Sequence, residues 1–231
     1  MPATATGSPV MFDSKALMGP GDWGGIVVQS GGDAKLTQLA MHRATVAFQA
    51  DPGSTYTIDY ILVDTSSTIA ELDADGTLGH GQRHGNGAKQ VGDPIFITSA
   101  SPKISDTLVD NSNSGTDQIN VSGLGSAPQF DHMEVTGCHC AFHFNQGKNI
   151  IISNSYVHDS AYGMMILGAV NTQVTNSNFE KNTVNIGDCF GAGNVVATGN
   201  YYDTAAFDMS CSGQTNNSPS ASKLANVGPR P

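Results

Sequence analysis

The sequence has few charged residues, no cluster of basic residues and no long apolar run. Only 13% of its 231 residues are charged, and the net charge is −10 with a pI near 4.8. Because no grouped Lys and Arg side chains are present to neutralise phosphates, we expect no binding to nucleic acid. Apolar runs stay well below the roughly 18 residues that a membrane helix needs, so the sequence predicts no transmembrane segment.

Helical periodicity is also missing from the chain. Short apolar runs alternate instead with turn-forming residues, and 27 glycines are present. Many short strands joined by tight turns would give this composition. The sequence therefore predicts an all-β protein, and its length is sufficient for one domain with a sizeable core.

Residues 128–213 contain four copies of one unit of about 22 residues. The apolar positions recur in three series, which are Phe130, Ile152, Val174 and Val196; Val135, Val157 and Phe179; and Phe142, Met164 and Ile186. A self-similar period of this length, with β-rich runs and no helical pattern, predicts a solenoid in which each repeat is one coil.

The same pattern, less regular, extends over residues 9–213 and predicts about eight coils. Residues 1–8 are expected to form an N-terminal cap or tail. Residues 214–231 are rich in proline and small polar residues, which indicates an extended tail along the body or over the last coil. The period breaks at residues 73–93, where six glycines and almost no apolar residue predict a long loop insertion.

Two of the four cysteines, Cys189 and Cys211, are one repeat apart, since 211 − 189 = 22. They should stack on neighbouring coils about 4.8 Å apart, which is within the Cα separation of a disulfide. Two interpretations stay open, a disulfide or two stacked thiols in the core. The chain begins without the charged and apolar regions of a signal peptide, but a disulfide would place it in a secreted or cell-surface setting. Cys138 and Cys140 are expected to be buried structural thiols.

The segments Ile152-Ser-Asn-Ser, Val174-Thr-Asn-Ser and Gly199-Asn-Tyr-Tyr-Asp203 resemble the repeats of right-handed parallel β-helix proteins. The resemblance is to the pectate-lyase-like group of carbohydrate-binding and sugar-processing β-helices, and it covers residues 9–213. It implies stacked parallel strands and an asparagine ladder at one turn. Asn154 and Asn176 would be rungs of this ladder, after His132, and their amides would satisfy backbone groups of the turn.

The resemblance also implies a ligand-binding face, because related β-helices bind ligands on an outward strand face. Strand alternation predicts an outward column through Val27, Ala47, Glu71, Asn120, His143, Met165 and Gly187. Glu71, Asn120 and His143 would form a polar ladder in this column. The 73–93 insertion follows directly, so we expect its Arg83 and Lys89 to fold over the ladder and contribute to ligand binding.

A metal site is one hypothesis for the same region. His80 and His84 of the insertion, with His143 and the carboxylates of Asp73 and Asp75, are suitable ligands for Zn²⁺ or Cu²⁺. The segment from Asp73 to Gly76 also resembles the opening of a calcium loop but lacks the later bidentate Glu, so Ca²⁺ would need backbone carbonyls. The alternative is a solvated glycine-rich loop with incidental histidines.

No carboxylate pair, nucleophile elbow or phosphate loop is recognisable in the sequence, and the Arg, Lys and Asp groups of β-helix lyases and glycosidases are missing. The leading hypothesis is an extracytoplasmic β-helix that binds a polysaccharide or another cell-surface component. A second is a metal-dependent, lyase-like enzyme, or another metalloprotein, with its site between residues 73–93 and the outer face. A third is a structural spacer within a surface protein.

Overall fold

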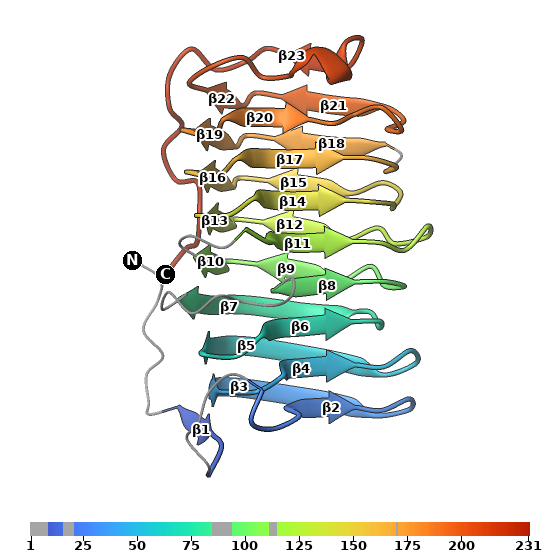
Figure 1. The fold of residues 1–231 in the computed structure, drawn as a ribbon, viewed down its shortest axis with the longest axis vertical. Coiled ribbons are helices and arrows are strands. Elements are labelled where there is room, and N and C mark those ends of the chain that lie inside the picture. Colours follow the sequence, from blue (N-terminus) through green and yellow to red (C-terminus); the bar gives the residue numbers. More distant parts are fainter. Residues whose placement is uncertain (1–8, 16–20, 85–93, 111–114, 170) are drawn as a thin grey trace.

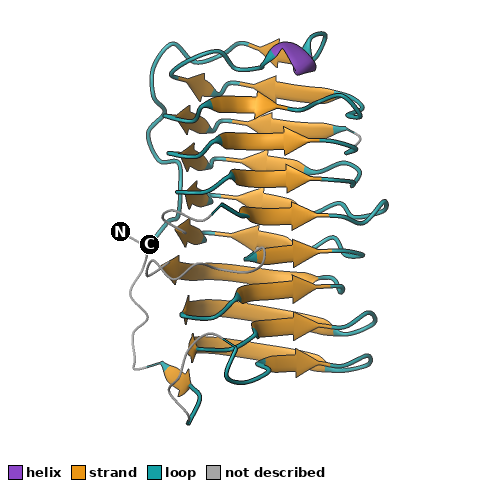
Figure 2. Ribbon diagram, viewed as in Figure 1, coloured by secondary structure: helices purple, strands orange, loops and turns teal. Residues whose placement is uncertain are grey.

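The computed structural model describes residues 9–15, 21–84, 94–110, 115–169 and 171–231. They form a right-handed parallel β-helix of eight coils stacked along one axis (Figure 1). Figure 2 shows that strands account for nearly all of the regular structure, as the sequence predicted. Within the described ranges no helix is long and apolar enough to cross a membrane.

Each coil contributes one strand to an eight-stranded parallel sheet. Its strands, in spatial order, are β2 (Ile26–Val28), β4 (Val46–Ala50), β6 (Thr68–Leu72), β8 (Ile95–Ile97), β11 (Asp117–Val121), β14 (Cys140–Phe144), β17 (Tyr162–Ile166) and β20 (Val184–Gly187). Parallel neighbours in register place the side chains of successive coils in straight columns.

The rest of each coil belongs to a fifteen-stranded sheet. A sharp bend in every coil divides this sheet into two parts that run side by side along the helix axis. The early coils cross the bend with long strands, namely β3 (Asp33–His42), β5 (Thr55–Asp64) and β7 (Gly76–His84), and β1 (Val10–Phe12) pairs with β3. Later coils divide into a first arm and a second arm. The first arm contains β9 (Lys103–Ser105), β12 (Gln129–Asp131), β15 (Ile151–Ser153), β18 (Thr172–Thr175), β21 (Val195–Thr198) and β23 (Thr215–Asn217). The second arm contains β10 (Leu108–Asp110), β13 (Glu134–Thr136), β16 (Tyr156–His158), β19 (Asn178–Glu180) and β22 (Tyr201–Tyr202).

One residue per coil makes the bend by adopting a left-handed backbone conformation. His132, Asn154 and Asn176 have φ values of 52°, 51° and 49°, so the predicted column at this turn is confirmed. Asparagine and histidine tolerate this conformation better than most residues with a side chain. Gly199 continues the column with a φ of 68°.

The hydrogen-bond ladder at the bend is made by the residues that follow this column, which corrects the prediction for Asn154 and Asn176. The backbone N–H of Met133 donates to Ser155 Oγ (3.1 Å), and that of Ser155 donates to Ser177 Oγ (3.0 Å). Ser177 N–H in turn donates to Asn200 Oδ1 (2.8 Å). The left-handed residue itself faces outward, so the next residue is the one whose side chain is buried against the backbone of the turn.

The core is a continuous stack of apolar side chains inside the coils. The predicted series through Val135 and through Phe142 are fully buried, as are Phe130, Ile152 and Val174. Val196 was wrongly predicted to continue that last series. It pairs with Gln173 and is partly exposed, and Ala197 fills the inward position. The coil before it is one residue longer than the 22-residue period, which shifts the strand and so reverses its faces.

The interruption at residues 73–93 is shorter than predicted. Residues 76–84 form β7, which pairs in parallel with β5 on one side and with β9 and β10 on the other. Few residues of β7 are apolar, so its own sequence does not predict a strand. Pairing with neighbouring strands on both sides accounts for its extended conformation. Residues 85–93, including Lys89, lie outside the described ranges.

The C-terminal region closes the last coil and then runs back along the helix. Cys189 and Cys211 form a disulfide with a Cα–Cα distance of 4.8 Å, as one interpretation of their spacing proposed. The short 3-10 turn η1 (Met209–Cys211) and β23 follow the eighth coil. From there the chain descends over the bend, where Leu224 N–H bonds to Asn178 Oδ1 (2.9 Å) and Gly228 N–H to the Asn154 carbonyl (2.8 Å) (Figure 1).

Candidate functional site

The outward column of the eight-stranded sheet can be followed through every coil by its pairing register. It contains Val27, Gln49, Glu71, Phe96, Asn120, His143, Met165 and Gly187. Glu71, Asn120 and His143 therefore share a column as predicted. One predicted position is wrong, because Gln49 rather than the fully buried Ala47 occupies the second coil. One position was missed, because Phe96 lies between Glu71 and Asn120.

Phe96 is the aromatic centre of this column. Its neighbours Ile95 and Ile97 are fully buried, whereas Phe96 is partly exposed on the outer face. Glu71 and Asn120 stand on the adjoining coils, about 4.8 Å away on either side. An apolar ring is thus flanked along the helix axis by a carboxylate and a carboxamide. We name this set of side chains the Phe96 row; it consists of Glu71, Phe96, Asn120 and His143.

Hydrogen bonds fix the orientation of Asn120. Its Oδ1 accepts from Ser122 Oγ (2.8 Å) and from Asn145 Nδ2 (3.2 Å). Only 7% of Asn120 is exposed, so its amide is held against the outer face rather than extended into solvent. Such preorganisation lowers the entropy that a side chain loses when it binds a ligand.

Asp117, at the start of β11, joins two histidines beside the row. Its carboxylate accepts from Nδ1 of His143 and from Nδ1 of His139, the latter at 3.0 Å. Asp117 and His143 side chains are 16% and 15% exposed, whereas His139 is 45% exposed and its ring lies 5.7 Å from that of Tyr162. Burial alone would raise the pKa of Asp117, but the hydrogen bonds and charges of His143 and His139 lower it below its ordinary value.

This arrangement has a direct chemical consequence. Because an anionic carboxylate only accepts hydrogen bonds, the Nδ1 atoms of both His139 and His143 must carry a proton. The other ring nitrogen of a neutral His139, Nε2, is then a hydrogen-bond acceptor. Sequence reasoning did not select Asp117 or His139. Asp117 lies at the end of a polar turn segment, where a functional residue is hard to distinguish from a turn residue. The feature that could have indicated its role is its register with Cys140, which starts the matching strand of the next coil.

The structure separates the residues of the predicted metal site. His143 is on the eight-stranded sheet, whereas His80 is at the bend of the other sheet, where its Nδ1 bonds to Asp59 Oδ1 (2.7 Å). Asp75 accepts from the backbone N–H of Ser101 (2.7 Å). Burial, with some contribution from a neighbouring carboxylate, raises the pKa of Asp73. For Arg83 and His84 only the backbone, in β7, is described.

No group of three or more His, Cys, Asp or Glu side chains in the described part of the chain is arranged to hold a metal ion. Cys138 and Cys140 are buried free thiols. Burial raises the pKa of Cys138 to about 12, against a smaller lowering by its Ser160 partner. Both thiols therefore stay protonated at neutral pH and serve as packing groups.

Fold and outer face together define the class, a right-handed parallel β-helix with one outward row that combines aromatic and polar side chains. No protein-family model matches the chain, and no curated protein matches its sequence. The structure thus establishes the parallel β-helix fold, and the function has to be argued from the face itself.

Proposed function

We propose that this protein binds a polysaccharide along the Phe96 row. The observation that carries the proposal is the position of Phe96 between Glu71 and Asn120. A sugar ring has an apolar face of C–H groups and a rim of hydroxyls. The face packs on an exposed aromatic ring, and the rim bonds to carboxylate and amide groups at its edge.

The direction of the row suits a polymer. Adjacent coils are 4.8 Å apart where the disulfide joins them, and this spacing is comparable to the length of one unit in an extended glycan chain. A polymer that lies along the helix axis would therefore place successive units over successive coils. The open face of a parallel sheet also leaves both ends of such a chain free to continue.

The Asp117 cluster supports the same ligand. The His139 side chain is nearly half exposed, and Asp117 fixes its tautomer. Its Nε2 then accepts from a hydroxyl, beside the amide and carboxylate groups of the row. The resemblance of the repeats to those of sugar-processing β-helices supports the ligand class by analogy. The Cys189–Cys211 disulfide supports an extracytoplasmic location, where such polymers are found.

A glycan array probed with purified protein tests the proposal, followed by isothermal titration calorimetry with the best polysaccharide. We expect Phe96→Ala to weaken binding about tenfold or more, because stacking and apolar burial are lost. Val196→Ala, which shortens a partly exposed side chain on the other sheet, is the control and should bind like the parent. Absence of binding across the array, or equal affinity for Phe96→Ala and the parent, would contradict the proposal.

A further inference from the structure

A groove of about 680 Å³ lies on the first arm of the fifteen-stranded sheet, away from the Phe96 row. It crosses β5, β7, β9, β12 and β15 beside the bend, and its volume is in the range of about 300–1,000 Å³ that is usual for ligand sites. Its polar lining includes Asp59, His80, Lys103, Gln129, Asp131 and Arg230.

Gly79 creates the space. The outward row next to the bend runs through Thr37, Asp59, Gly79, Ser105, Asp131 and Ser153, and Gly79 alone in this row has no side chain. Its φ is not left-handed, so the backbone does not require glycine there. A Cβ built on Gly79 would lie 3.2 Å from Asp59 Oδ1 and 3.7 Å from Ser105 Oγ. Any larger side chain would therefore project into the groove.

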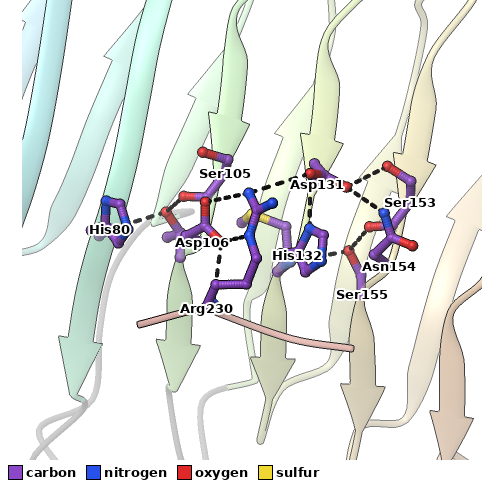
Figure 3. A network of polar contacts seen from close by, with 12 residues as sticks. His80, Ser105, Asp106, Asp131, His132, Ser153, Asn154, Ser155 and Arg230 are labelled. Atoms are coloured by element: carbon purple, nitrogen blue, oxygen red, sulfur yellow. Dashed lines mark hydrogen bonds and ion pairs between the residues drawn. The ribbon is translucent and has the colours of Figure 1, made fainter. Parts of the chain in front are cut away.

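The polar groups around this gap are held in place before any ligand arrives. Asp59 Oδ1 bonds to His80 Nδ1 (2.7 Å), and the His80 ring stacks on Tyr60 with a centroid distance of 4.5 Å and an interplanar angle of 5°. On the other side, Asp131 accepts from Ser153 Oγ (2.7 Å) and Asn154 Nδ2 (2.8 Å). Figure 3 shows His80, Asp131, Ser153 and Asn154 along the bend.

Arg230 of the C-terminal tail completes one side of the groove (Figure 3). Its Nε donates to Asp106 Oδ1 (2.7 Å) and its Nη2 to Asp106 Oδ2 (2.8 Å), while Nη2 lies 3.6 Å from Asp131 Oδ2. Asp106 is almost fully buried, so this bidentate pair fixes the guanidinium plane. The tail thereby turns an open sheet face into a walled groove.

The lining carries charges of both signs, with Asp59 and Asp131 beside Lys103 and Arg230, and the Arg230 charge is already paired with Asp106. The hydroxyls and the Gln129 amide add donors and acceptors without charge. A phosphate or an acidic polymer would meet two carboxylates, and a polycation would meet two basic groups. We propose that this groove is a second binding site, specific for a short neutral oligosaccharide. The proposal depends on none of the residues in the Phe96 row. An experiment can therefore disprove binding at one site without disproving binding at the other.

The test is titration calorimetry with a panel of neutral trisaccharides (cellotriose, maltotriose and mannotriose), performed in the Phe96→Ala background so that the first site is weakened. We expect at least one of them to bind, and Gly79→Val to weaken that binding about tenfold or more by filling the gap. Thr175→Val changes the same outward row on the coil beyond the groove and should leave the affinity unchanged.

If Gly79→Val fails to fold, the double variant Lys103→Ala/Gln129→Ala removes two exposed lining side chains and should give the same loss. The proposal is overturned if none of the trisaccharides binds. It is also overturned if the folded Gly79→Val protein, or the double variant in its place, binds like the parent. Loss of polysaccharide binding in Phe96→Ala with trisaccharide binding retained would confirm two independent sites.

Discussion

The carboxylate of Asp117 bonds to His143 Nδ1 across the boundary between two coils, at a sequence separation of 26. Both side chains are largely buried on the outer face of the eight-stranded sheet. The same carboxylate holds His139, so one acidic group orients two imidazoles. This cluster therefore connects β11 and β14 by side chains in addition to their backbone pairing.

Replacing Asp117 by Asn should destabilise the protein in a pH-dependent way. The folded protein lowers the pKa of Asp117, so its stabilising effect is present above the unfolded value of about 3.9 and is lost as the pH falls through the folded value. We expect Asp117→Asn to lower the free energy of unfolding by about 1.5–3 kcal/mol at pH 7, as for hydrogen bonds to charged groups. The difference should shrink toward pH 3. Urea unfolding across this range measures it.

Asp33→Asn is a matched control for that experiment. The side chain of Asp33 is 58% exposed, with one hydrogen bond from Thr55 and an exposed ion pair with Lys35 at 3.8 Å, so its replacement should change stability by less than about 0.5 kcal/mol. Equal losses for the two variants would show that the histidine cluster has no special contribution.

The sequence was sufficient to predict the register wherever the 22-residue period holds. The pairing of His143 with Met165 followed from that spacing, and so did the proximity of Cys189 and Cys211, which the structure joins in a disulfide. Before residue 128 the coils vary in length. The left-handed residues Tyr60, His80 and Asp106 are 20 and then 26 positions apart, since 80 − 60 = 20 and 106 − 80 = 26.

The irregular coils explain why Phe96 was missed, because it lies 25 residues after Glu71 and 24 before Asn120, since 96 − 71 = 25 and 120 − 96 = 24. Gln49 is 22 residues from both Val27 and Glu71, so the period itself indicated it, and the choice of Ala47 was an error of two residues. The groove was not predictable from the sequence either, and the reason is different. Arg230 is 124 residues away from Asp106, and no periodic pattern indicates where a tail docks.

The Cys189–Cys211 disulfide should stabilise the C-terminal end of the β-helix. It closes a loop with a sequence separation of 22 residues, for which the loss of unfolded-state entropy corresponds to about 3 kcal/mol. We expect the double variant Cys189→Ala/Cys211→Ala to lose approximately this much, because η1 is no longer attached to the eighth coil. Thermal unfolding with and without dithiothreitol provides the measurement.

The double variant also supplies the control for reduction. Dithiothreitol should lower the unfolding temperature of the parent but have no further effect on the double variant, since the other two thiols are free and buried. A parent protein whose unfolding temperature is insensitive to reduction would contradict a stabilising role for the bridge.

The Arg230–Asp106 pair should anchor the tail and stabilise the folded protein at neutral pH. Burial alone would raise the pKa of Asp106, but the hydrogen bonds and charge of Arg230 lower it, so this contribution is present above the unfolded pKa and lost in acid. Because Arg230 is 54% exposed and screened by solvent, we expect Arg230→Ala to cost about 1 kcal/mol at pH 7, which is less than a buried charged hydrogen bond contributes. Arg230→Lys should recover only part of the loss, since a lysine keeps the charge but not the bidentate geometry.

Limited proteolysis, read by mass spectrometry, should show cleavage within residues 223–231 increasing in the order parent, Arg230→Lys, Arg230→Ala. Identical cleavage and unfolding curves for the three proteins would mean that other contacts hold the tail.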